Sequence, residues 1–165
     1  MQRRIKCNLT VDSINQAINE LKDYRQHVRE LAMELGQELV EQGVYEAKTW
    51  IIAMNAVETG SLLDSIEGFF DPWSGKGFIK TDSNHAAYVE YGTGVRGEEE
   101  RPFGIDPNMP EGWEYDKNNH GHYGWYYGKD NRRWTKGMPP RPFMYKTFLV
   151  LCDRASEQVR AKYNG

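Results

Sequence analysis

An apolar repeat near the start of the chain is the feature that most constrains the fold. Between Val11 and Leu39, apolar side chains recur at alternating spacings of three and four residues, and Arg25 alone interrupts the series. The other members are Ile14, Ile18, Leu21, Val28, Ala32 and Leu35. This spacing gathers them on one face of an α-helix. It predicts a long amphipathic helix that begins near Thr10 and Asp12, with Ser13-x-x-Gln16 as a capping box, and ends at Gly43.

The apolar face of this helix needs a partner. The register holds for more than three heptads, so a coiled-coil seam with another subunit is one alternative. The other is that the helix lies on the chain's own sheet, and we expect this arrangement. The charge of Arg25 favours the edge of a subunit contact over its centre.

The remaining elements follow from apolar spacing and turn residues. Residues 44–57 continue helically, and 61–70 predict a strand with Gly68 as a bulge or bend. Turn formers fill 71–77, and 78–81 predict the returning strand of a hairpin. Helical spacing returns from Phe143 to about Tyr163. At 165 residues, we expect one domain spanning 1–165.

A long insertion separates these elements between Val95 and Gly137. Residues 95–108 predict a loop, and 110–134 are rich in glycine and aromatic residues. Two segments, 123–127 and 132–135, flank a four-residue turn at 128–131. They predict an aromatic β-hairpin that projects from the body.

Two short stretches predict rigid bends. Asn84–Gly94 is typical of a short helical turn that Ser83 or Asn84 caps and Gly92 closes with positive φ. Pro139–Met144 has three prolines in four residues, which stiffens the approach to the last helix. We assign these residues to a structural joint: Tyr88, Glu90, Tyr91, Gly92, Thr93, Pro142 and Phe143.

Glu90 stands between apolar and aromatic neighbours, where a carboxylate is costly unless it accepts hydrogen bonds. We expect its partners to be backbone N–H groups near Thr93, or Arg141. This role is structural, because no second residue supports a catalytic one.

No motif predicts catalysis, a metal or a cofactor. His120 and His122, with Asp116 nearby, offer two metal ligands at most. Cys7 and Cys152 lack ligand spacing and predict free thiols of a reducing compartment. We therefore expect a protein that is not an enzyme and has no cofactor.

Three further signals are weak. His85 has no nucleophile at a recognisable spacing, and Glu98–Glu100 predict a solvated acidic loop. Gly92–Gly94 lacks the pattern of a phosphate-binding loop. A hydrolase using Glu90, Glu98 or His120 stays as an alternative, although the sequence shows no carboxylate pair to support it.

Charge is divided between two segments of the insertion. The whole chain has a net charge of -3, so it lacks the general basic field of nucleic-acid or anionic-membrane binders. Five cations and one acid give residues 129–141 a net charge of +4, whereas seven acids and one arginine give 98–116 a net charge of -6. One chain that carries both segments suits a head-to-tail contact between identical subunits, which closes into rings.

The residues that we assign to this interface are Trp125, Tyr127, Arg132, Arg133 and Trp134. Cations beside aromatic rings also bind single-stranded nucleic acid or glycans. The alternative function is therefore a nucleic-acid or glycan binding module that uses the hairpin 123–136. The longest apolar runs are about five residues, such as 50–54, so we expect neither an export signal nor a membrane span.

Three stretches carry a resemblance to a known family. They are Thr59–Ile66, Ala87–Thr93 and the Gly137-x-Pro-Pro-Arg-Pro-Phe143-Met144 stretch before the last helix. In this order, they resemble the small tail-component or neck proteins of long-tailed bacteriophages and prophages, the Hong Kong 97 phage gene-ten family of minor structural proteins. The resemblance covers about residues 10–163, and the aromatic insertion departs from the family pattern.

The resemblance implies an α+β subunit in which a small antiparallel sheet packs against the long N-terminal helix and the C-terminal helix. It further implies a non-enzymatic structural virion protein that acts in head–tail joining or tail assembly. Its partners would be other neck or tail proteins and copies of itself in a homo-oligomeric ring. Its location would be the virion, after assembly in the cytoplasm of the bacterial host.

Overall fold

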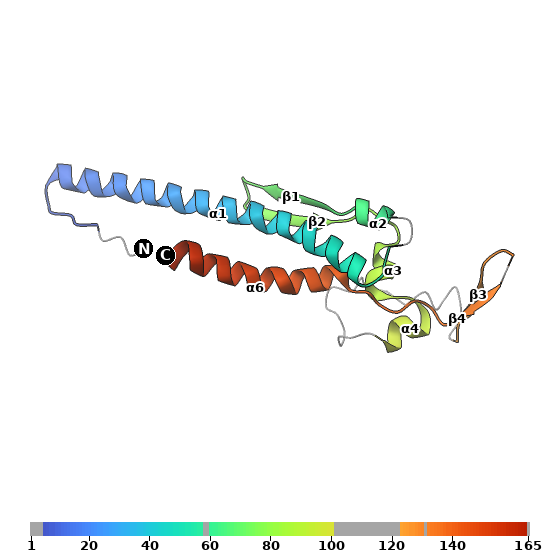
Figure 1. Cartoon of the computed structure of the whole chain (residues 1–165). Helices are drawn as coiled ribbons and strands as arrows, with labels where there is room; N and C mark the ends of the chain where they lie inside the picture. The colour runs from blue at the N-terminus through green and yellow to red at the C-terminus, as the bar shows by residue number, and fades with distance from the viewer. Residues whose placement is uncertain (1–4, 58–59, 101–122, 131, 165) are drawn as a thin grey trace.

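The structure, a computed structural model, describes residues 5–57, 60–100, 123–130 and 132–164. Two helices lie side by side along the molecule, α1 (Val11–Ala53) and α6 (Phe143–Asn164), and a β-hairpin covers α1 on another side (Figure 1). The hairpin consists of β1 (Glu67–Asp71) and β2 (Lys76–Lys80). This arrangement confirms the predicted α+β class, with a small antiparallel sheet packed on the long N-terminal helix.

Helix α1 begins near Thr10 as the sequence predicts, but its cap is Thr10 and not the predicted box Ser13-x-x-Gln16, and the helix ends later than predicted. The Thr10 side chain accepts the backbone N–H of Ser13 at 3.4 Å, which caps the first turn. The predicted end at Gly43 is wrong, because the helix continues to Ala53. Gly43 is buried, and an added Cβ would clash with the side chain of Ile79 and lie 3.0 Å from Leu151. This glycine therefore serves the close approach of β2 and α6.

The hairpin is shorter than predicted at its start. Residues 61–64 form a short helix, α2 (Ser61–Asp64), so the predicted strand at 61–70 begins only at Glu67. Leu62 and Ile66 are both buried, and their spacing of four matches a helical turn. Gly68 makes no bulge, since it pairs with Ile79 in regular register. Its missing side chain lets Val40 and Val44 of α1 approach the strand.

The middle of the chain adds two short helices and a second hairpin. These are α3 (Ala86–Tyr91), α4 (Gly94–Glu99), β3 (Trp125–Tyr127) and β4 (Arg133–Thr135). Helix α4 corrects the predicted loop at 95–108 over its first part, and the remainder lies outside the described residues. The pairing of Tyr126 with Trp134 confirms the aromatic hairpin, which projects from one end of the molecule (Figure 1).

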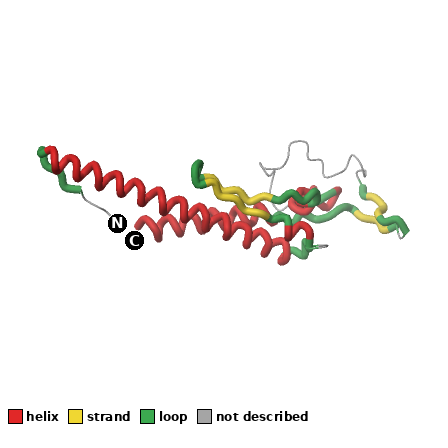
Figure 2. Tube along the Cα trace, turned by 90° about the horizontal axis from the view of Figure 1, so that it is seen from above, coloured by secondary structure: helices red, strands yellow, loops and turns green. Residues whose placement is uncertain are grey.

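The core lies under the C-terminal half of α1. Its buried members come from α1, α2 and the residues just after it, α3 and the start of α6, namely Ala47, Ile51, Leu62, Ile66, Ala86, Val89 and Phe143. Lys162, near the end of α6, pairs with Glu34 and Glu38 at 3.4 and 3.0 Å. The first twenty or so residues of α1 therefore extend past the end of α6, as two perpendicular views show (Figures 1 and 2). No helix in the described ranges has the length and apolar character needed to cross a membrane.

Candidate functional site: an interlocked joint at the start of α6

The carboxylate of Glu90 holds the N-terminus of α6. Helix α3 places this side chain in the interior, where it is 8 % exposed. Oε2 accepts the backbone N–H of Met144 at 2.9 Å, and Oε1 accepts that of Tyr145 at 3.0 Å. The first N–H groups of a helix have no partner within the helix, and their partial positive charge favours an anion. Glu90 thus supplies a cap from a distant part of the chain.

The partners of Glu90 correct a detail of the prediction. The sequence suggested N–H groups near Thr93 or the side chain of Arg141, whereas these two bonds go to the first turn of α6. The backbone of Arg141 takes part in another way, because its N–H donates to the carbonyl of Val89 at 2.7 Å.

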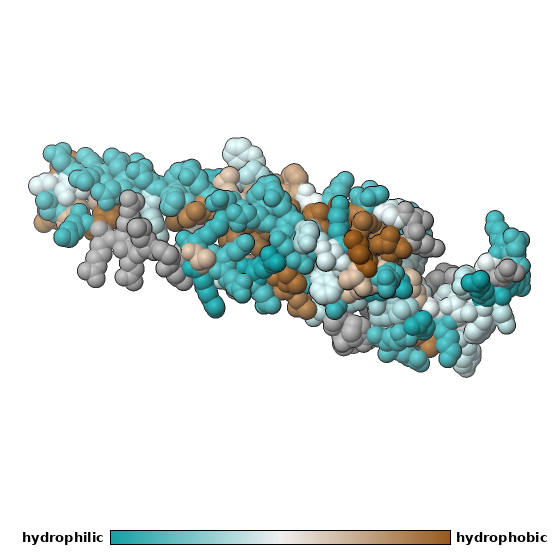
Figure 3. Space-filling model, viewed as in Figure 1, coloured by the Kyte–Doolittle hydropathy of each residue, from teal (hydrophilic) through white to brown (hydrophobic). Residues whose placement is uncertain are grey.

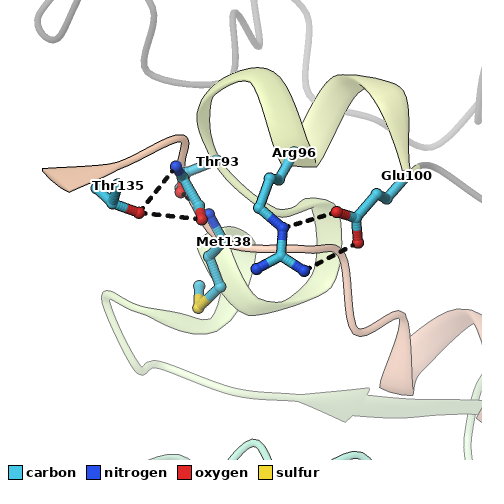
Figure 4. A network of polar contacts seen from close by, with 6 residues as sticks. Thr93, Arg96, Glu100, Thr135 and Met138 are labelled. Atoms are coloured by element: carbon cyan, nitrogen blue, oxygen red, sulfur yellow. Dashed lines mark hydrogen bonds and ion pairs between the residues drawn. The ribbon is translucent and has the colours of Figure 1, made fainter. Parts of the chain in front are cut away.

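Thr93 and Met138 form a second connection between the two bends. The N–H of Thr93 donates to the carbonyl of Met138, and the N–H of Met138 donates to Oγ1 of Thr93, both at 2.9 Å (Figure 4). Farther along, the N–H of Arg96 donates to the carbonyl of Lys136 at 3.1 Å. Together with the bond from Arg141 to Val89, these contacts show that residues 89–96 lie alongside residues 136–141 in the opposite chain direction. The two predicted bends are therefore one structure, which we call the joint.

Gly92 permits this close approach. Its φ of 75° confirms the predicted positive value, and the residue is buried. An added Cβ would lie 2.6 Å from the carbonyl oxygen of Met138 and 2.8 Å from the nitrogen of Pro140. Both the backbone conformation and the available space therefore exclude a side chain at this position.

The joint is anchored in the core through the first residues of α6. Phe143 is 1 % exposed and Pro142 is buried. Thr147 is also buried, and its Oγ1 donates to the carbonyl of Phe143 at 2.8 Å. Of the two tyrosines assigned to the joint, Tyr91 is half-buried whereas Tyr88 is exposed.

A pocket of about 600 Å³ opens beside Glu90, between α3 and α6. Its lining consists of Thr81, Ser83, Ala86, Ala87, Glu90, Tyr91, Phe143, Met144, Tyr145 and Phe148. Within this lining, Glu90 is the sole carboxylate and no imidazole is present. Glu98 of the hydrolase alternative is exposed on α4, and His120 lies outside the described residues. Among the described residues, the pocket therefore brings neither a second carboxylate nor a histidine to Glu90.

The residues assigned to the interface lie apart from this pocket, on the β3–β4 hairpin. Tyr127 and Trp134 are each 51 % exposed, and Arg132 and Arg133 are exposed. The rings of Tyr126 and Trp134 meet edge to face, with centroids 4.9 Å apart. These side chains form an aromatic and cationic surface at the end of the molecule.

Trp125 differs from the other predicted interface residues. It is half-buried, and its ring atoms lie 2.7 and 3.1 Å from the position that a Cβ on Gly94 would occupy. The Oγ1 of Thr135 accepts the N–H of Gly137 at 3.1 Å on the neighbouring strand (Figure 4). Trp125 therefore packs the hairpin against the joint, whereas the bond between Thr135 and Gly137 is local, two residues along the chain.

The acidic side of the predicted subunit contact is described only at its beginning. Arg96 binds Glu100 through Nε at 2.6 Å and through Nη2 at 3.2 Å (Figure 4). This hydrogen bond raises the pKa of Arg96 and lowers the pKa of Glu100. Residues 101–116 of the acidic segment lie outside the described residues.

The described ranges contain no group of three or more histidine, cysteine, aspartate or glutamate side chains that could hold a metal ion. The group that the sequence singled out, His120, His122 and Asp116, lies outside those ranges. The spacing of the last helix placed Thr147 on the same face as Phe143, but the residue was not assigned to the joint, where its hydroxyl bonds to Phe143. Comparison with protein-family models, curated protein sequences and solved structures finds no match to this chain.

Proposed function

We propose that the protein is a structural virion protein of a tailed phage or prophage, acting in head–tail joining or tail assembly through subunit contacts. The observation that supports this proposal most is the convergence of the three stretches that carry the family resemblance. Leu62 and Ile66 of the first stretch share a core cluster with Val89 of the second and Phe143 of the third. The second and third stretches are also hydrogen-bonded to each other. The three stretches therefore form one rigid framework, which is the part of a structural protein whose geometry we expect a family to keep.

The polar groups of the joint act on the chain itself. Glu90 caps α6, and the Thr93 hydroxyl accepts the N–H of Met138. These bonds fix the direction in which α6 and the β3–β4 hairpin leave the joint. A rigid mount for projecting elements suits a subunit whose work is to position its neighbours.

The projecting elements carry exposed apolar and aromatic side chains. Trp73, at the tip of the β1–β2 hairpin, is 89 % exposed. Tyr126 and Trp134, the middle pair of the β3–β4 hairpin, are 63 and 51 % exposed. Exposed aromatic residues with neighbouring arginines are typical of protein interfaces. We propose other neck or tail proteins, and copies of this chain in a ring, as the partners.

The test removes the gene from the phage or prophage that carries it and examines the particles by electron microscopy. Loss of infectivity with unjoined heads and tails is expected, and normal infectious virions would contradict the proposal. Complementation with Arg133→Glu should restore fewer particles than the wild type if the hairpin is a contact surface. Arg160→Glu is the matched control, because Arg160 is an exposed residue of α6 away from the hairpin.

The exposed hairpin also favours the alternative, a nucleic-acid or glycan binding module. Stacking needs free aromatic faces beside cations, and Tyr127 with Arg132 and Arg133 offers both. Retention of the purified chain on single-stranded DNA or on a glycan array distinguishes this function from subunit contact. DNA binding would weaken steeply with salt, and Arg133→Glu would reduce it.

A further inference from the structure

The N-terminal half of α1 presents an apolar face that the described part of the chain leaves open. Val11 is 73 % exposed, and Ile14, Ile18 and Leu21 are 40, 43 and 56 % exposed. Residues 5–10 run back below the first turns of the helix (Figure 1), and the exposed fractions show that they leave this face open. Figure 3 shows apolar patches among hydrophilic side chains at this end of α1. We call the series Val11, Ile14, Ile18, Leu21, Arg25 and Val28 the α1 seam.

The α1 seam continues the apolar face that is covered elsewhere in the molecule. The same alternation of three and four residues leads to Leu35, which is 8 % exposed, and to Leu39, which is half-buried. On the N-terminal side of Glu34, α1 extends past the end of α6, and the β1–β2 hairpin does not reach this part of the helix (Figures 1 and 2). Most of the stability of an amphipathic helix in water comes from packing its apolar face. The uncovered half of α1 is therefore the part of the helix that would be stabilised by a further helix on this face.

We propose that this helix is α1 of a second copy, running antiparallel along the α1 seam. With the two helices centred between Asn19 and Glu20, Val11 lies opposite Val28 of the second copy, and Ile18 lies opposite its Leu21. Each apolar layer of one copy then meets an apolar or partly apolar layer of the other over about 27 Å. The contact is self-complementary, as a two-fold dimer requires.

Charge selects the antiparallel direction. A parallel pair in register would place Arg25 against Arg25 within the seam, which is unfavourable for like charges. In the antiparallel pair, Arg25 lies opposite Ile14 of the second copy. Asp12 lies opposite the turn of the second copy that carries Arg25 and Arg29, so that opposite charges meet at both ends of the contact.

This inference goes beyond the proposed function and does not depend on it, since it concerns the free chain in solution. Sedimentation equilibrium of the full chain over a concentration series should show a dimer that dissociates on dilution. Leu21→Glu should weaken it on the order of 100-fold, because the two-fold contact places the buried charge in the seam twice. Asn19→Glu adds the same charge in the same turn of α1 at a position outside the seam series, and it should leave the dimer intact.

Circular dichroism of both variants shows whether α1 stays helical. A dimer lost in Leu21→Glu with unchanged helix content supports the seam. A chain that is monomeric at every concentration overturns the proposal, as does an oligomer that Leu21→Glu leaves unchanged.

Cross-linking tests the direction. Cys7 and Cys152 are free and exposed, so the background carries Cys7→Ser and Cys152→Ser. Chains with Val11→Cys and chains with Val28→Cys are mixed and oxidised. Disulfide-linked heterodimers support the antiparallel pair. Efficient linkage of Val28→Cys chains to one another would show a parallel pair and overturn the arrangement.

Discussion

The carboxylate of Glu90 accepts the backbone N–H of Tyr145, 55 residues later, at 3.0 Å. Its other oxygen accepts the N–H of Met144, so both oxygens are used at the start of α6. Glu90→Gln keeps the size of the side chain but turns one acceptor into a donor that faces an N–H group. We expect a loss of about 1–3 kcal/mol in the free energy of unfolding, measured by urea denaturation. Glu99→Gln, at an exposed position of α4, is the control, and equal effects of the two changes would contradict the capping role.

Gly92 and Gly75 form a matched pair for the joint. Both have positive φ, of 75° and 70°, but an added Cβ meets backbone atoms only at Gly92 and open space at Gly75. Gly75→Ala should cost about 1 kcal/mol for its conformation alone. Gly92→Ala should cost at least about 2 kcal/mol more, because the backbone of Met138 and Pro140 must move. Thermal unfolding of both variants checks the difference, and similar melting temperatures would disprove the close packing at the joint.

Gly43→Ala sets helix propensity against packing. Alanine in the interior of α1 gains about 1 kcal/mol over glycine. The added methyl group would clash with Ile79 and crowd Leu151, and overpacking costs about 1–3 kcal/mol. We expect net destabilisation in chemical denaturation. A second change, Ile79→Val, should recover part of the loss by making room, whereas a more stable Gly43→Ala variant would place β2 farther from α1.

The turn of the β1–β2 hairpin should respond to acid. The carboxylate of Asp71 accepts bonds from the N–H of Trp73 and from the Ser74 hydroxyl and N–H. These bonds, the Ser74 side chain foremost, lower the pKa of Asp71. Because the folded pKa is below that of the unfolded chain, the stabilisation is complete above about pH 3.9 and disappears as the pH falls through the lowered pKa. An NMR titration of the Asp71 carboxyl should show a midpoint that Ser74→Ala raises.

Local patterns predicted those parts of the fold that local forces decide. The three and four spacing of α1, the helical spacing after Phe143 and the turn residues around Gly75 each correspond to an observed element. The positive φ of Gly92 was predicted in the same way, because the turn itself demands it.

Tertiary contacts decided the rest. Glycine is typical of a helix end, but Gly43 lies inside α1. It is needed there because the side chains of Ile79 and Leu151 pack closely against it. The sequence predicted that Glu90 needs hydrogen-bond partners, but it could not identify them. The partners are the backbone N–H groups of Met144 and Tyr145, and every residue except proline carries such a group. The contact between the two bends could not be predicted for the same reason, because it is made largely by backbone groups that the sequence does not distinguish.

The paired bonds between Thr93 and Met138 hold the two ends of the intervening segment against each other. The two ends of this segment are therefore attached to the body of the protein at fixed points. A longer segment between them should cost little stability, because lengthening a closed loop costs little additional entropy. A fluorescent or affinity module spliced into the middle of this segment should leave the helices and the first hairpin undisturbed.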